Sequence, residues 1–292
     1  MTPQPQPQPQ PQSSAQAQAQ DPSLPRLAED FHALHTPGRP LLLANAWDAL
    51  SARIAAAEGA RAIATTSAGV AWTLGAPDGD LVDTGIALEA AARIVAAVPG
   101  LPVTVDIEGG YAPDAAGVGD TIRRVLAIGA VGVNIEDGTR PHDEHVRRIA
   151  AARAAADTAG VRLFVNARID VYLAGLAAPD DRLAESLRRA AACVDAGADG
   201  VFVPGVSDPA TVRELAAGVR APLNVLVGAG APPVAELAAA GAARISTGSS
   251  VALATYARMR DLTHELLTEG TVRGAADGYA YADVNALLRK GG

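Results

Sequence analysis

The sequence predicts a (β/α)8 TIM barrel with a disordered N-terminal tail and an extra C-terminal helical segment. From Pro40 onward, eight short β-rich runs alternate with Ala-, Leu- and Arg-rich stretches of helical period. Eight alternations of strand and helix indicate a parallel sheet with helical crossovers. The chain after the tail, roughly 265 residues, has the length of one α/β barrel. A doubly wound open sheet is the alternative, because periodicity does not show whether a sheet closes.

The expected strands are short aliphatic runs that end in polar residues or glycine. In chain order they are 40–47, 62–69, 102–110, 132–137, 163–170, 200–205, 223–228 and 244–249. Segments with an apolar face at helical spacing lie between them, for example 48–60, 119–130, 144–160 and 180–198. Several of these segments end in a Gly-Ala pair, which is typical of a helix C-terminus followed by a tight turn.

The two ends of the chain lie outside this eightfold pattern. Residues 1–25 are a Pro/Gln/Ala-rich repeat without apolar periodicity, so they bury too little surface to fold and are expected to be disordered. They contain no basic segment followed by an apolar one, so they do not resemble a secretory signal. We expect the barrel to span 26–270. The helical segment 271–292 is expected to pack on the barrel or on a neighbouring subunit, because its apolar face is too small to stand alone.

Composition excludes several classes of function. The formal net charge of −8 argues against a nucleic-acid partner, since phosphates require a basic face. No run approaches the roughly 18 apolar residues of a membrane span, so a soluble, cytoplasmic protein is expected. Cys193 is the only cysteine, which excludes an internal disulfide and any multi-cysteine metal site. Its Ala and Val neighbours at helical spacing indicate an inert, buried thiol.

Polar side chains gather where the expected strands end, which is the end of a barrel that carries the chemistry. Residues i and i+2 of a strand share a face, so three neighbouring strands should point polar side chains at a common mouth. These are Asp106 and Glu108, Asn134 and Glu136, and Asn166, Arg168 and Asp170. Unpaired acids there cost on the order of several kcal/mol, which a divalent cation removes, and Mg²⁺ prefers carboxylate oxygens and waters. Salt bridges to Arg168, or capping of the next helix, are the alternative.

Several motifs occur together in the order of a known family. The segments NAWDALSARIAAAEGARAIATTSAGVAWTLGAPDGD, VTVDIEGGYA, GVNIEDG and VNARIDVYL resemble the isocitrate lyase and phosphoenolpyruvate mutase superfamily, between Leu41 and Tyr256. Members of that superfamily are Mg²⁺-dependent barrels that make or break C–C or C–P bonds next to a 2-oxo acid, through an enolate held on the metal. The resemblance implies this fold, Mg²⁺ or Mn²⁺ as cofactor, a small 2-oxo acid or hydroxy-diacid as substrate, and a homo-oligomer, as a tetramer.

The resemblance also implies roles for individual residues. Asp106 resembles the direct metal ligand, Glu108 stands where the family's second acid is usually Asp, and Glu136 matches another metal-side carboxylate. Asp78 matches the acid near the metal's waters, so the implied catalytic residues are Asp78, Glu136 and Arg168. Arg168 also resembles the arginine that pairs with the substrate carboxylate. The implied substrate-binding residues are Ser67, Ala68, Gly69, Arg168 and Asn224.

The chain departs from the family's lyases after the expected fourth strand. Isocitrate and methylisocitrate lyases carry a Lys-Lys/Arg-Cys-Gly-His segment there, with the cysteine as proton donor, whereas this chain has DGTRPHDEHVRR. Gly205 stands where those lyases place a glutamate. His142 and His145 lie near the altered segment and are more simply explained as surface residues, although His142 is a candidate for the lost contact.

These features predict an enzyme that cleaves a C–C or C–P bond beta to the carboxylate of a small 2-oxo acid. Oxaloacetate decarboxylation and phosphonopyruvate cleavage are the specific hypotheses, because loss of CO₂ or a phosphoryl group needs an electron sink and no base to start. A C–C lyase acting on a hydroxy-diacid, as 2-methylisocitrate lyase does, is one alternative. A non-catalytic metabolite-binding barrel is the other.

Overall fold

The barrel predicted from the sequence is present in the computed structural model, which describes residues 23–289. All strands are parallel and form one sheet in the order β1-β9-β8-β7-β6-β5-β4-β3-β2. They are β1 (Leu41–Leu43), β2 (Asn45–Ala46), β3 (Ile63–Thr65), β4 (Val103–Asp106), β5 (Gly132–Glu136), β6 (Phe164–Arg168), β7 (Gly200–Phe202), β8 (Leu223–Leu226) and β9 (Arg244–Ser246). β1 pairs with β9 and β2 with β3, and only Ala44 separates β1 from β2. The sheet therefore closes through one interrupted strand, and the open-sheet alternative is wrong.

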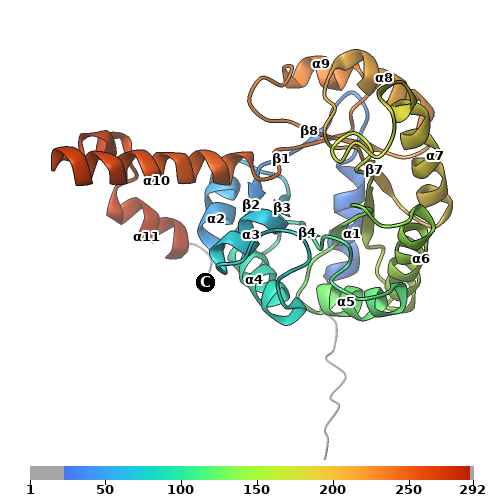
Figure 1. Cartoon of the computed structure of the whole chain (residues 1–292). Helices are drawn as coiled ribbons and strands as arrows, with labels where there is room; N and C mark the ends of the chain where they lie inside the picture. The colour runs from blue at the N-terminus through green and yellow to red at the C-terminus, as the bar shows by residue number, and fades with distance from the viewer. Residues whose placement is uncertain (1–22, 290–292) are drawn as a thin grey trace, which may run out of the picture.

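Helices connect the strands and form the outer layer (Figure 1). They are α1 (Leu24–Ala33), α2 (Ala49–Ala57), α3 (Ser67–Thr73), α4 (Thr84–Ala97), α5 (Ala115–Ala127), α6 (His142–Thr158), α7 (Arg182–Asp195), α8 (Pro209–Gly218), α9 (Val234–Ala239), α10 (Ser250–Glu269) and α11 (Tyr281–Arg289). Short 3-10 turns lie at η1 (Pro179–Asp181) and η2 (Arg273–Asp277). Asp48, Asp83, Asp114 and Asp208 precede α2, α4, α5 and α8, and each side chain accepts a backbone N–H of the first turn. Each such cap contributes about 1 kcal/mol to helix stability.

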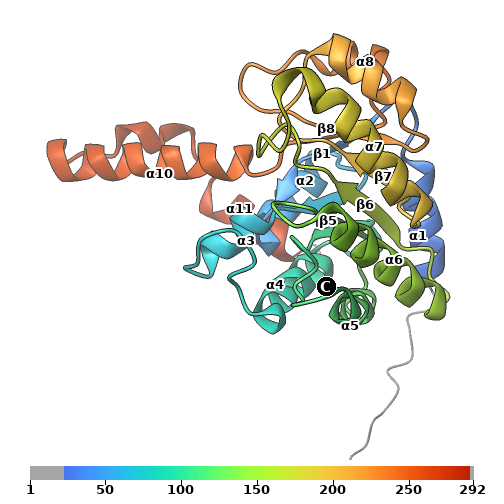
Figure 2. The same ribbon diagram turned by 45° about the vertical axis from the view of Figure 1, so that its right-hand side comes forward.

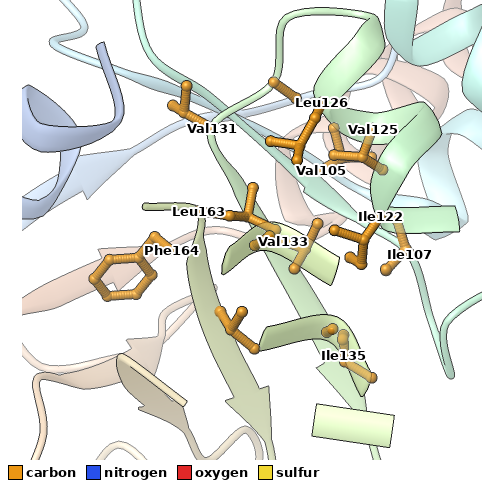
Figure 3. Close-up of a cluster of buried hydrophobic side chains, with 14 of the residues drawn as sticks. Val105, Ile107, Ile122, Val125, Leu126, Val131, Val133, Ile135, Leu163 and Phe164 are labelled. Carbon is orange, nitrogen blue, oxygen red and sulfur yellow. The ribbon is translucent and has the colours of Figure 1, made fainter. Parts of the chain in front are cut away.

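The main hydrophobic core lies between the barrel wall and its helices. Val105, Val133 and Ile135 point outward from β4 and β5 and pack near Ile122 and Val125 of α5 (Figure 3). All five side chains are buried, and burial of each contributes about 1.5–3 kcal/mol. Because side chains alternate along a strand, this packing turns the intervening polar residues toward the barrel axis.

Helix α1 closes the N-terminal end of the barrel and was not predicted. The Phe31 ring meets the Phe164 ring edge to face, with centroids 5.5 Å apart, and His35 stacks on Phe164 at 4.0 Å. The sequence signal is the spacing of the buried residues Leu24, Ala28 and Phe31, after which the chain enters β1. The predicted disordered segment 1–25 therefore runs into a helix at Leu24, and its residues 1–22 lie outside the described residues.

The C-terminal helices leave the barrel. Helix α10 extends away from the strands, and α11 turns back to contact α2 (Figures 1 and 2). Gly270 ends α10 in the left-handed conformation, with φ of 68°. The predicted boundary at residue 270 coincides with this turn, although the chain already leaves the barrel wall with α10. None of the helices within 23–289 is long and apolar enough to cross a membrane.

Candidate active site

Asp106 ends β4 at the C-terminal mouth of the barrel. Its carboxylate accepts the Ser67 hydroxyl at 3.2 Å, and its backbone N–H donates to Thr65 Oγ1 at 2.8 Å. Burial raises the pKa of Asp106, and Asp78 raises it further, against the opposing charge of Arg168. The residue that the sequence singled out as a metal ligand is therefore a half-buried acid whose charge is only partly compensated.

Glu108 lies close to Asp106, but not for the reason predicted. Strand β4 ends at Asp106, and Glu108 has left-handed backbone with φ of 50°. Its N–H approaches Asp106 Oδ1 at 3.4 Å, while its own carboxylate accepts the backbone N–H of Asp80. The side chain is buried, and burial together with Asp80, Asp78 and Asp106 raises its pKa to about 7. The expectation that alternation along one strand aligns the two acids is wrong; a turn brings them together.

Arg168, at the end of β6, is held by two acids. Its Nε and Nη2 donate to the two carboxylate oxygens of Asp170 at 2.8 and 3.1 Å, and Nη1 pairs with Glu136. Burial raises the pKa of Glu136 to about 8, with smaller contributions from Asp106, Asp170 and Glu108, although the charge of Arg168 lowers it. The alternative in which Asp106 and Glu108 pair directly with Arg168 is not the arrangement found.

Two further charged residues stand on the rim of the mouth. Arg140 follows β5 and forms a salt bridge with Asp80, with about a quarter of each side chain exposed (27% and 28%). Asp78 and Asp80 lie in the turn after α3, and both add to the electrostatic repulsion on Glu108. Asp78, Asp80, Asp106, Glu108 and Glu136 are called the mouth acids below. Asp80 and Arg140 were not among the residues predicted from the sequence.

The predicted substrate-binding residues fall in two places. Ser67, Ala68 and Gly69 form the first turn of α3 rather than a loop, so their N–H groups lack intrahelical partners. Their position beside Asp106 follows from the Ser67 hydrogen bond. Asn224 is 1% exposed within the barrel, and its amide donates to Ser246 Oγ at 3.1 Å. The structure thus brings Ser67 to the mouth acids and buries Asn224 in the barrel interior.

The barrel interior below the mouth is polar. Arg244 is 1% exposed and donates from Nη2 to Asn134 Oδ1 at 3.2 Å, and Asn134 Oδ1 also accepts from Asn166 at 2.9 Å. Within the described residues, Arg244 Nε and Nη1 have no hydrogen-bond partner, nor do Asn166 Oδ1 and Thr104 Oγ1. Burial lowers the pKa of Arg244 to about 9, against the opposing effect of Asp106. Such groups are suited to ordered internal water.

The chemistry of this donor set fits a hydrated Mg²⁺. Across residues 23–289, no three His, Cys, Asp or Glu side chains are arranged to hold a metal ion by themselves. Glu108 is engaged by Asp80 and Glu136 by Arg168, so these two would reach a cation through water. Mg²⁺ usually keeps several waters and takes one or two carboxylates plus substrate oxygens. Asp106 as the direct ligand, with the other mouth acids around it, matches that preference.

A second polar cluster lies one residue beyond Glu136. Asp137 is fully buried, accepts from Arg189 Nη1 at 2.7 Å and from the Asp170 N–H at 2.8 Å. His145 is also fully buried, contrary to the expected surface position; its Nε2 lies 3.1 Å from the Ile135 carbonyl and its Nδ1 3.5 Å from the Cys193 thiol. Burial lowers the pKa of His145 to about 4 and raises that of Cys193 to about 12. Asp137, Arg189, His145 and Cys193 are called the Asp137 network below.

Known proteins resemble this chain in sequence and in fold. The family model of phosphoenolpyruvate phosphomutase matches residues 31–267. The chain belongs to this family. It is 31% identical to a phosphoenolpyruvate phosphomutase of Streptomyces hygroscopicus, over 85% of this chain and 82% of the relative. It is also 31% identical to an oxaloacetate decarboxylase of Ectopseudomonas mendocina, over 68% of this chain and 70% of the relative. A crystal structure of a candidate phosphonomutase from Burkholderia cenocepacia is 43% identical, with a TM-score of 0.78 and coverage of 82% and 99%.

Proposed function

We propose that the protein cleaves a C–C or C–P bond beta to the carboxylate of a small 2-oxo acid with the help of Mg²⁺. Oxaloacetate decarboxylation and phosphonopyruvate cleavage are the specific reactions proposed. The observation that supports this most directly is the grouping of Asp106, Glu108 and Glu136 at the mouth, with Arg168 paired to Glu136. The family adds support, since its named relatives include an oxaloacetate decarboxylase and a phosphoenolpyruvate phosphomutase.

Arg168 and the first turn of α3 are proposed to bind the substrate carboxylate. Asp170 fixes the plane of the Arg168 guanidinium group through two hydrogen bonds, so this group is preorganised for a carboxylate. Ser67 links that turn to Asp106. A 2-oxo acid bound there would have its oxo oxygen close to the acid proposed as metal ligand.

The reaction needs a sink for negative charge and a proton donor. A bound Mg²⁺ supplies the sink, because a Lewis acid stabilises the charge that develops on the 2-oxo oxygen. The electron pair of the broken bond remains on the substrate, whose C3 must then take up a proton. The group lost from C3 departs as CO₂, or passes to water as inorganic phosphate in the case of phosphonopyruvate. Glu136 is proposed to supply the proton, because its carboxyl group lies at the mouth beside Arg168, the proposed substrate-binding arginine.

The altered segment after β5 favours this reaction over a retro-aldol cleavage. A hydroxy-diacid lyase must also remove a hydroxyl proton and use a thiol-like donor near the mouth. Cys193 lies on α7, fully buried beside His145, and cannot reach a substrate there. A C–C lyase therefore remains the second candidate and would have to use Asp78, Glu136 or His142 instead.

The test is metal-dependent release of pyruvate from oxaloacetate and from phosphonopyruvate, followed with lactate dehydrogenase. Activity should require Mg²⁺ or Mn²⁺ and stop with EDTA. Release of glyoxylate from 2-methylisocitrate or isocitrate would instead support the lyase candidate. Binding of a 2-oxo acid without any turnover would leave the metabolite-binding barrel.

We further propose that the chain forms a homotetramer through α10 and α11. Leu253, Met259 and Leu267 of α10 are 53%, 65% and 79% exposed, and α10 extends away from the barrel (Figure 1). An apolar helix in this position is expected to pack on a neighbouring subunit. Truncation after Gly270 removes α11 and should lower the number of subunits found by light scattering; an unchanged number of subunits would contradict the role of 271–292. The cytoplasmic location stays a prediction for cell fractionation.

A further inference from the structure

The rim of the mouth holds a cation whose surroundings are unusual. Arg140 comes from the segment after β5, where the chain departs from the family's lyases. Its guanidinium group lies directly on Gly109, so that a Cβ at position 109 would overlap it. The place where a Cβ on Gly138 would stand is 3.7 Å from Arg140 Nη1 and 3.9 Å from Glu136 Oε1. Arg140 therefore lies beside the mouth acids, over the turn that contains Glu108.

The backbone beneath Arg140 is strained. Asp80, Glu108 and Tyr111 have φ of 59°, 50° and 49°, and within 23–289 no other non-glycine residue has positive φ. Left-handed backbone in such residues costs on the order of 1–3 kcal/mol each and clusters at ligand sites. Asp80 contacts both Arg140 and the Glu108 turn, through its salt bridge and through hydrogen bonds to Glu108 and to Gly109 N at 3.3 Å. Arg140 and the strained residues Asp80 and Glu108 thus lie in loops that contact one another.

Arg140 is the arginine at the mouth that remains for a second anionic group of the substrate. Arg168, paired with Glu136 and Asp170, is the residue proposed to bind the C1 carboxylate, and Arg244 is buried below the mouth. A substrate with a second anionic group on C3 places that group near the mouth acids, whose negative charge repels it. Of the arginines placed at the mouth in the described structure, Arg140 combines a single acidic partner with partial exposure.

We propose that Arg140 is the specificity residue that binds the anionic group at the far end of the substrate, on C3 of the 2-oxo acid. This inference rests on the proposed function and assigns a residue to the anionic group on C3, which is a carboxylate or an oxyacid group of similar charge. Asp80 is the partner that Arg140 exchanges for the ligand. Gly109 keeps the guanidinium group in place, because only a residue without a side chain leaves room for it.

Two ligands that differ by one anionic group test the proposal without turnover. Pyruvate and 3-sulfopyruvate share the 2-oxo acid, and only the second carries a charged group on C3, as a sulfonate. Calorimetry with the Mg²⁺-saturated protein should show that Arg140→Gln weakens 3-sulfopyruvate about ten- to a hundredfold, as expected for a lost charged hydrogen bond. Pyruvate affinity should change less than threefold. The affinity of Arg140→Lys for 3-sulfopyruvate should lie between those of the wild-type protein and Arg140→Gln.

Gly109→Ala is the second variant, because it moves the guanidinium group and keeps its charge. It should weaken 3-sulfopyruvate more than pyruvate, and the double variant with Arg140→Gln should add little. Arg123→Gln, on the exposed face of α5, is the matched control and should change neither ligand.

If Arg140→Gln lowers the affinity for both ligands equally, Arg140 has only a structural role. If it lowers neither affinity, Arg140 does not contact the ligand. Either result overturns the proposal. If 3-sulfopyruvate binding depends on Arg140 while no 2-oxo acid is turned over, the proposed reaction fails and the specificity role stands. If wild-type protein binds neither ligand, both proposals fall.

Discussion

The mouth acids and the Asp137 network lie side by side, but the negative charge is compensated in the Asp137 network and not among the mouth acids. Asp137 is fully buried and has both carboxylate oxygens bonded, one to Arg189 and one to the Asp170 N–H. Glu136, the preceding residue, shares Arg168 with Asp170 and has a pKa of about 8. A buried acid with full compensation contributes to the fold, whereas acids left with excess charge are poised for a ligand. Neighbours in sequence thus serve different purposes.

The largest expected effect is on catalysis, from Asp106→Asn. Loss of the proposed metal ligand should lower catalytic efficiency by about a thousandfold or more, which corresponds to about 4 kcal/mol of transition-state stabilisation. The fold should remain, because the variant removes a half-buried carboxylate whose pKa is raised. Calorimetry with Mg²⁺ and thermal unfolding separate the two effects. Asp195→Asn, on the surface, is the control. Unchanged Mg²⁺ affinity in Asp106→Asn would contradict the metal site.

The next effect is on stability, from Asp137→Ala. Arg189 would lose a 2.7 Å partner at a site where the acid is fully buried. Breaking a buried pair on one side costs about 3–5 kcal/mol, so the urea midpoint should fall clearly. The m-value should not change. If Asp137→Ala has the same urea midpoint as the wild-type protein, the Asp137 network does not stabilise the fold and does not differ from the mouth acids in this respect.

A smaller effect is expected from pH. The pKa values of Glu108 and Glu136 are raised from 4.5 to about 7 and about 8, so the folded protein binds more protons than the unfolded chain. The free energy of unfolding should therefore fall as pH rises through these values. Between pH 6.5 and 8.5, where the buried His35 and His145 stay neutral, we expect a loss of about 1–2 kcal/mol.

Urea unfolding at several pH values, with EDTA and with Mg²⁺, checks this dependence. Mg²⁺ should reduce the loss, because it binds the ionised carboxylates. Glu136→Gln should flatten the profile above pH 7. A metal-free profile that rises with pH in this window would show that the mouth acids are not desolvated.

The smallest effect is expected for Cys193→Ala. The thiol is buried in the Asp137 network beside His145, and burial raises its pKa to about 12. Activity should stay within threefold of the wild-type protein, with a stability loss of about 1 kcal/mol from the small cavity. If activity instead falls about a hundredfold or more while the fold stays intact, the thiol has a role in proton transfer.

The sequence predicted the barrel and most of the mouth because both depend on local pattern. The eight runs each contain a strand, and the polar residues of β4, β5 and β6 end at one mouth. Closure could not be read from periodicity, since it depends on Ala44 dividing one run into two strands with different partners. Helix α1 was missed because its apolar spacing lies next to a Pro/Gln-rich segment.

The missed features of the site depend on contacts between distant segments. Glu108 owes its position to a left-handed turn and to Asp80, a residue far along the chain. His145 is buried because α6 packs against α7, where Cys193 meets it. Arg140 gave no sequence signal beyond a charge in the segment that departs from the family's lyases, and its importance depends on the space above Gly109.

The polar layer inside the barrel bears on how the protein responds to temperature. Most barrels of this class fill their centre with branched aliphatic side chains, whereas Thr104, Asn134, Asn166, Asn224 and Arg244 occupy it here, all buried. Unfolding hydrates apolar surface from the outer shell, which raises the heat capacity, and polar surface from this layer, which lowers it. The heat-capacity increment should therefore be smaller than for an aliphatic barrel of equal length. The stability curve should be correspondingly flatter, with cold and heat denaturation further apart.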